Sequence, residues 1–307
     1  MFYANRMESR PVPSTTSQRM AQMCRRNRIT ILAVALSLAG AKNGATQAPG
    51  NAPLPNPSEL LQRAIANERQ IASQRERYEC RVTDVSIETD SSGNVKKTVT
   101  EVKDQFYVNG IPIERLLQKD GKELSGDEAH KQDERVMKET IKYSNQETAK
   151  KEQDRQIKQL EEMMEAMMLA NGRRESVNGR TVLFYDIVPN PKFNAKNLNQ
   201  RISQVMQGKI EIDEQTGMVI DMNVKSVADL KLAGGLVANV HKGLWIHAHA
   251  HPQPDGVWLN DLSEGSGDAR AALFLHPYFR FKETTDNCHL YTATATQVGP
   301  VQVVKQP

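Results

Sequence analysis

Three histidines alternate with apolar residues in the segment from Trp245 to His251, which reads Trp-Ile-His-Ala-His-Ala-His. Successive side chains of a β-strand point to opposite faces, so a strand here places all three imidazoles on one face. Imidazole nitrogens bind Zn²⁺ and Cu²⁺, and same-face neighbours lie roughly 6.6–7 Å apart at their Cα atoms. His247, His249 and His251 are therefore candidate metal ligands, although three would share one ion only on a bent strand. The simpler interpretation is a solvated strand face that tolerates histidine.

A group of apolar side chains near the middle of the chain has the spacing of one face of an α-helix. It consists of Ile157, Leu160, Met163, Met164, Met167 and Met168. The flexible methionine thioether adapts to varied apolar partners and also binds Cu(I). The spacing alone predicts a helix that packs on its own sheet, and a lid over a lipid cavity is a special case of that packing. The four methionines are candidate ligand-binding residues.

The sequence contains none of the short motifs that identify the common enzyme classes. There is no Gly-x-Ser-x-Gly nucleophile motif, no His-Glu-x-x-His zinc motif, no phosphate-binding loop and no dinucleotide fingerprint. We therefore expect a protein that is not an enzyme and that needs no cofactor.

The N-terminal part of the chain has the layout of a secretory signal. A basic cluster at residues 25–28 precedes an almost wholly apolar run at residues 29–39, and small residues allow cleavage after Ala41 or Ala48. The run is shorter than the roughly 20 residues that a membrane-spanning helix needs, which favours cleavage over an uncleaved anchor. We expect residues 1–48 to be a signal peptide with an upstream extension, and the mature protein to be periplasmic or otherwise exported.

Removal of this segment changes the charge of the chain. The whole chain has a formal net charge of +3, and seven of its basic residues and one acidic residue lie in residues 1–48. The remaining chain therefore carries a net charge of about −3, which gives no electrostatic reason to expect nucleic-acid binding. No later stretch is long and apolar enough to predict a stable membrane span in the mature chain.

Two cysteines, Cys80 and Cys288, lie outside the signal segment. An even pair of cysteines in an oxidising compartment is able to form a disulfide. Two separate buried thiols are the alternative, and the sequence leaves both open.

The first part of the mature chain predicts a helix and a hairpin. Residues 49–57 form a proline-rich linker, and a short amphipathic helix follows from Ser58, a good N-cap. Strands are expected at residues 78–89 and 95–108, because the turn-forming sequence at residues 90–94 lies between them.

A long charged segment follows this hairpin. Residues 110–126 read as a loop with one helical patch at residues 113–117. Ser125 and Glu128 then form a capping box, which predicts the start of a helical insertion at about residues 125–172. We expect either two helices or one long interrupted helix there.

The second part of the chain predicts serial antiparallel strands. After a strand at residues 182–188, the clearest hairpin has apolar residues at alternate positions, which are the candidate lining of a core or cavity: Ile210, Ile212, Met218, Ile220, Met222 and Val224. Four more strands are expected, at residues 244–251, 257–262, 269–281 and 288–295.

These elements predict an α+β fold. Its main part is a curled antiparallel sheet, an open and incomplete β-barrel, with an N-terminal helix and a long helical insertion that covers one side. Residues 58–300 form this single half-barrel domain, and residues 301–307 are a tail.

This layout resembles the periplasmic lipoprotein-carrier half-barrels, the lipoprotein localisation factors and their outer-membrane lipoprotein-sorting relatives. The likeness spans about residues 58–296 and is carried by short stretches at residues 106–110, 115–116, 119–125, 188–193, 208–213 and 256–259. In that family an open barrel holds acyl chains against an apolar concave face, under helices that act as a lid. The resemblance implies apolar-ligand binding here, but it transfers no individual lipid-contacting residue.

Three functions remain as hypotheses. The first is an exported, non-enzymatic binding protein that holds a lipid, a lipoprotein acyl chain or another apolar ligand in the concave face of the sheet. The second is an envelope metal-binding protein that uses the three histidines. The third is a protein-interaction or sensor module that contacts other envelope proteins through the charged segment at residues 127–155.

Overall fold

Antiparallel strands make up most of the protein in the computed structural model, which describes residues 53–90, 92–232, 238–271 and 278–290. The helices are α2 (Pro57–Arg75), α3 (Gly126–Ser144), α4 (Gln146–Glu165) and α5 (Leu198–Ser203). The first strands are β1 (Tyr78–Thr89), β2 (Val95–Val108), β3 (Ile111–Lys119), β4 (Lys122–Glu123), β5 (Met167–Val177) and β6 (Arg180–Pro189). The later strands are β7 (Met206–Asp213), β8 (Val219–Ser226), β9 (Leu230–Leu232), β10 (Ala238–Val240), β11 (Trp245–Pro252), β12 (Trp258–Ala271) and β13 (Tyr278–Leu290).

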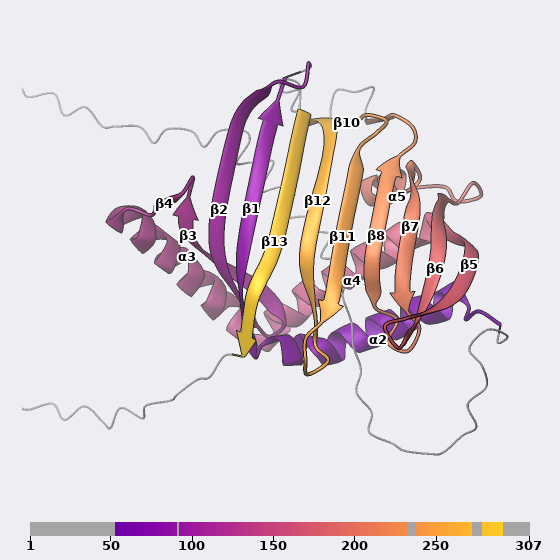
Figure 1. Cartoon of the computed structure of the whole chain (residues 1–307), viewed down its shortest axis with the longest axis horizontal. Helices are drawn as coiled ribbons and strands as arrows, with labels where there is room; N and C mark the ends of the chain where they lie inside the picture. Colours follow the sequence, from indigo (N-terminus) through magenta and orange to yellow (C-terminus); the bar gives the residue numbers. More distant parts are fainter. Residues whose placement is uncertain (1–52, 91, 233–237, 272–277, 291–307) are drawn as a thin grey trace, which may run out of the picture.

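The strands form one large open sheet in the order β4-β3-β2-β1-β13-β12-β11-β8-β7-β6-β5 (Figure 1). Strands β9 and β10 pair with each other, and β10 also pairs with β12. Every pair is antiparallel, and β1 pairs with β13, so the last strand joins the first meander to the second. The sheet is not closed, because β4 and β5 are its two ends. The expected large, open antiparallel sheet with a few helices is confirmed.

The first hairpin confirms the sequence prediction, since β1 and β2 begin and end at the expected residues. The expected loop and helical patch that follow are wrong, because residues 111–119 form strand β3. Asn109 and Gly110, with φ of 46° and 72°, make the tight turn into β3. Ile111 and Ile113 are then buried at alternate positions, which is the spacing of a strand.

The charged segment forms two helices that are separated at Asn145. The predicted capping box is present: Ser125 Oγ accepts from Glu128 N, and Glu128 Oε2 accepts from Ser125 N. Asn145 has an extended backbone and caps α4 by accepting from Thr148 N at 2.9 Å. The helices therefore occupy residues 126–165, and the expected continuation to residue 172 is wrong.

The later strands begin and end at other residues than expected. β12 covers the expected strand at residues 257–262 and continues to Ala271, whereas β13 runs from Tyr278 to Leu290. Within the described residues, three strands lie where the sequence predicted four, and most of the expected strand at residues 288–295 lies outside them. Residues 1–48, the first four residues of the linker, residues 291–295 and the tail at 301–307 lie outside the described residues.

Helix α2 runs along one end of the sheet and is attached to the turns there (Figure 1). The side chains of Arg63 and Asn67 donate to carbonyl oxygens of the β7–β8 turn, and Arg75 Nε donates to Trp258 O at 3.2 Å. Gly217 in that turn has φ of +77°, and a Cβ there would lie 3.0 Å from Ala64 N of the helix. The turn and α2 therefore fit together only because residue 217 is glycine. Within the described ranges, no helix is both long and apolar enough to cross a membrane.

Candidate ligand-binding site

The six apolar residues predicted from the β7–β8 hairpin all lie in or against the core beneath the helices. Ile210, Ile212 and Val224 are buried in one cluster with Leu60 of α2, and Met222 packs against that cluster. In a neighbouring cluster, Met218 is buried with Ile71, Ala250 and Trp258, and Ile220 packs against them. The structure therefore brings these positions together as one apolar face, which α2 covers in this form of the protein.

The methionine stripe is split by the end of α4, so its prediction as one helical face is wrong. Met163 and Met164 lie half-buried in the last turn of α4, whereas Met167 and Met168 belong to β5. The helix stops because Asn190 N donates to Ala166 O at 3.0 Å and β5 begins to pair with β6. Met167 packs against the main core cluster, and the next side chain, Met168, is 41% exposed.

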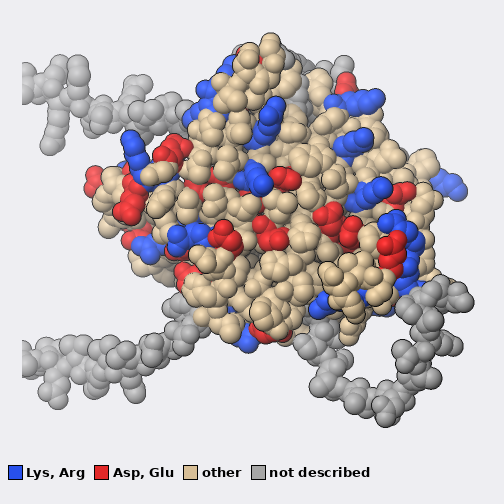
Figure 2. Space-filling view, in the orientation of Figure 1, with Lys and Arg blue, Asp and Glu red and all other residues tan. Residues whose placement is uncertain are grey.

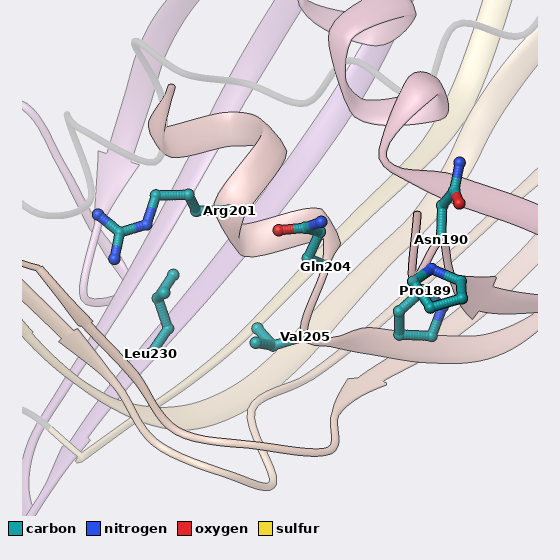
Figure 3. A pocket seen from close by; sticks show the side chains of 7 residues that line it. Pro189, Asn190, Arg201, Gln204, Val205 and Leu230 are labelled. Carbon is teal, nitrogen blue, oxygen red and sulfur yellow. The ribbon is translucent and has the colours of Figure 1, made fainter. Parts of the chain in front are cut away.

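An open pocket of about 390 Å³ lies where the loop after β6, helix α5 and strand β9 meet (Figure 3). Arg201 and Leu230 lie on one side of the pocket in Figure 3, Pro189 and Asn190 lie on the other, and Gln204 and Val205 lie between them. Seven residues line it: Pro189, Asn190, Pro191, Arg201, Gln204, Val205 and Leu230. The pocket thus combines apolar side chains with amide and guanidinium groups, as ligand sites usually do.

The floor of this pocket is continuous with the apolar interior of the protein. Val205 and Leu230 belong to a cluster that also contains Leu244. Ile202, on the buried side of α5, packs against this cluster and against the main cluster of β6, β7 and β8. The apolar face that the sequence predicted therefore reaches the surface at this pocket.

Hydrogen bonds within and between its segments hold the pocket wall in place. Asn197 caps α5 by accepting from Gln200 N at 3.0 Å, and Val227 N donates to Val205 O at 2.8 Å. The Gln204 side chain donates to Phe193 O, which ties the loop after β6 to the end of α5. The sequence does not predict the pocket residues, because no periodic pattern connects three segments that lie apart in the chain.

The three histidines lie on β11 and are held by carboxylates of the neighbouring strands. His247 Nε2 lies 2.7 Å from Asp221 Oδ2, and His247 Nδ1 lies 3.2 Å from Glu264 Oε1. Asp261 contacts two imidazoles, His249 Nδ1 at 2.7 Å and His251 Nδ1 at 3.2 Å.

A β-bulge in β12 brings Asp261 next to both His249 and His251. Ala250 pairs with Asn260 and His249 pairs with Leu262, so Asp261 is the extra residue of β12. Among the residues that the structure describes, no group of three or more His, Cys, Asp or Glu side chains has the geometry of a metal site. The histidines therefore take part in cross-strand contacts with carboxylates. Figure 2 shows acidic and basic side chains interspersed over the viewed face of the molecule.

The pKa of His247 depends on two opposing influences. Burial lowers its pKa, but the hydrogen bonds and charges of Asp221 and Glu264 outweigh burial, so the pKa is raised above its usual value. This imidazole is accordingly more readily protonated than a free histidine.

A buried group of charges lies on β1, β2 and β3. Lys103 is 2% exposed, and its Nζ lies 3.1 Å from Asp84 Oδ2. Glu101 and Glu114 each place a carboxylate oxygen 3.6 Å from the same nitrogen. The sheet therefore has an ionic interior at this end and an apolar interior near β7 and β8.

Cys80 and Cys288 form a disulfide between β1 and β13. This bond lies where the first meander pairs with the last strand, beside the buried side chains of Tyr78, Val257 and Leu259.

Comparisons with known proteins yield little likeness. No family model matches this sequence, and no curated protein matches it. A crystal structure of a DUF1329 family protein from Desulfovibrio piger covers 80% of this chain and 94% of that chain, at 9% identity and a TM-score of 0.27. A crystal structure of MucB in complex with MucA(peri) covers 78% of this chain and 100% of that chain, at 10% identity and a TM-score of 0.20. Both TM-scores are too low to support an argument about fold or function.

Proposed function

We propose that this protein is an exported, non-enzymatic binding protein that holds an apolar ligand, such as a lipid or a lipoprotein acyl chain. The ligand enters through the pocket beside α5 and inserts toward the apolar face of β6, β7 and β8. The observation that carries this proposal is the continuity of the pocket floor with the core, through Val205, Leu230 and Ile202.

The energetics of burial support this arrangement. Each methylene group that leaves water contributes about 0.8 kcal/mol, so a chain that extends from the pocket toward the core gains affinity with its length. The helices that cover this face are anchored differently. α2 donates two hydrogen bonds to the β7–β8 turn and one to the start of β12, whereas Ala149 and Ile157 are the buried residues of α4. We expect α5, which borders the pocket, to move when the ligand enters, and α2 to stay in place.

The test is a titration with a fluorescent long-chain fatty acid, with and without Val205→Glu. The substitution places a charge on the pocket floor, where an apolar chain would lie, so it should weaken binding at least about tenfold, given the cost of burying an unpaired charge. Leu198→Glu is the matched control, since Leu198 is 44% exposed on α5 and does not line the pocket. Equal binding by Val205→Glu and wild type, or no binding by wild type, would contradict the proposal.

A second candidate function, protein interaction, is favoured by helix α3. No residue of α3 is buried, and Met137 and Ile141, four residues apart on one face, are 57% and 67% exposed. The measurement is affinity capture from an envelope extract with wild type and with a Met137→Ser/Ile141→Ser variant. A partner retained equally by both proteins would show that this face is not the contact.

A further inference from the structure

The pocket lies in a part of the chain with an unbalanced charge. Between residues 187 and 210 the chain has four basic residues and no acidic residue: Lys192, Lys196, Arg201 and Lys209. Lys192 and Lys196 are exposed in the loop that also supplies Pro189, Asn190 and Pro191 to the pocket lining. The loop that forms one wall of the pocket therefore carries two exposed lysines, within a mature chain expected to be slightly acidic.

Arg201 is the charged side chain among the described residues that line the pocket. In Figure 3 its guanidinium lies on the same side of the pocket as Leu230. The two lining amides are engaged with the backbone, since Gln204 donates to Phe193 O and the side-chain nitrogen of Asn190 lies 3.5 Å from Glu165 O. The carboxylate of Glu165 is also near this wall, and it accepts from Gln200 Nε2 at 3.4 Å.

We infer that the pocket selects an apolar ligand with an anionic head group, a carboxylate or a phosphate, which Arg201 binds at the mouth while the chain lies against Val205 and Leu230. A guanidinium offers parallel N–H donors that match carboxylate and phosphate oxygens, and such charge-assisted bonds are stronger than neutral ones. The exposed lysines add attraction at longer range. This inference rests on the proposed function and names the chemical class of the ligand.

The experiment compares two ligands of equal chain length, palmitate and uncharged hexadecanol, by competition with a fluorescent fatty acid. Wild type should bind palmitate more tightly. Arg201→Gln should weaken palmitate binding by about ten- to a hundredfold, the size expected for one charge-assisted hydrogen bond, and leave hexadecanol binding unchanged. Arg280→Gln, which removes an exposed arginine on β13 outside the pocket, should change neither affinity.

The outcomes distinguish failure of the head-group inference from failure of the proposed apolar-ligand binding. If hexadecanol and palmitate bind equally, or if Arg201→Gln weakens both alike, the head-group inference is overturned and the proposed function stands. If neither ligand binds wild type, both are overturned. Inorganic phosphate and acetate serve as free anions. Competition by either at concentrations similar to palmitate would show a simple anion site and overturn the assignment to a lipid head group.

Discussion

Single residues give the two ends of the sheet different chemistry. Lys103 and its three carboxylates occupy the interior near β1 and β2, whereas Ile210 and Val224 occupy the interior near β7 and β8. The sequence predicted the apolar positions, because strand alternation is visible in one hairpin. It did not predict the buried ion cluster, because a lysine in a polar strand is most often on the wet face. The sequence does not predict the pocket residues either, because three separate segments of the chain form the pocket.

Replacement of Lys103 by methionine should strongly destabilise the protein. The substitution leaves buried carboxylates without their central cation, and breaking a buried ion pair in this way costs about 3–5 kcal/mol. Arg173→Met is the control, because the Arg173–Glu175 pair is exposed and such pairs contribute about 0–1 kcal/mol. Urea unfolding of both variants measures the difference, and equal losses would contradict the assignment of a buried cluster.

The contribution of His247 to stability should depend on pH. Its pKa is raised in the folded protein, so protonation favours folding. The stabilisation is complete below the unfolded-state pKa of about 6.5 and is lost as the pH rises through the folded-state value. Replacement by glutamine should therefore cost more stability at pH 5.5 than at pH 8.5. These pH values lie about one unit below and two units above the unfolded-state pKa. Urea unfolding at both pH values tests this, and a pH-independent cost would exclude the ion pairs with Asp221 and Glu264.

Secondary-structure elements differ in how well the sequence predicts them. β1 and β2 were predicted to the residue, because the turn between them is strong and both strands are rich in Val and Thr. The sequence predicts a loop with a helical patch where β3 lies, since the alternation of β3 is short and its entry turn is a single Asn109–Gly110 pair. The end of α4 was placed too late, because pairing of β5 with β6 overrides a helical spacing that continues to Met168.

Helix α2 should depend on Leu60 for its attachment to the sheet. Leu60 is 2% exposed in the main core cluster, and Leu→Ala changes at such positions cost about 2–5 kcal/mol. Leu198→Ala removes the same atoms at an exposed position of α5, and it should cost less than about 0.5 kcal/mol. Chemical denaturation of the two variants makes the comparison. A small effect of Leu60→Ala would show that α2 is held mainly by its hydrogen bonds to the turns.

The whole molecule is organised around the junction of β1 and β13. These strands are far apart in the sequence, yet they join the two meanders into one sheet. The sequence predicted serial hairpins correctly, but it could not specify this long-range pairing, because hydrophobic periodicity carries no information on which strands meet. The disulfide between Cys80 and Cys288 closes the same junction across a separation of 208 residues.

Removal of this disulfide should destabilise the whole sheet. A cross-link that closes a long loop restricts the unfolded chain, and loss of such a bond costs about 2–5 kcal/mol. The double variant Cys80→Ala/Cys288→Ala and the wild type should be compared by thermal unfolding without reductant. Addition of a reductant should lower the melting temperature of wild type and leave that of the variant unchanged. A wild-type melting temperature that does not respond to complete reduction would contradict this role.

We propose that the pocket beside α5 admits an apolar ligand to the interior of the sheet. The most direct measurement is lipid mass spectrometry of the protein purified under mild conditions from the envelope of the cells that make it, in parallel with Val205→Glu and an unrelated exported protein. We expect a stoichiometric apolar molecule on wild type and its loss from the variant. A wild-type protein that carries no more lipid than the unrelated protein would show that the pocket holds no apolar ligand.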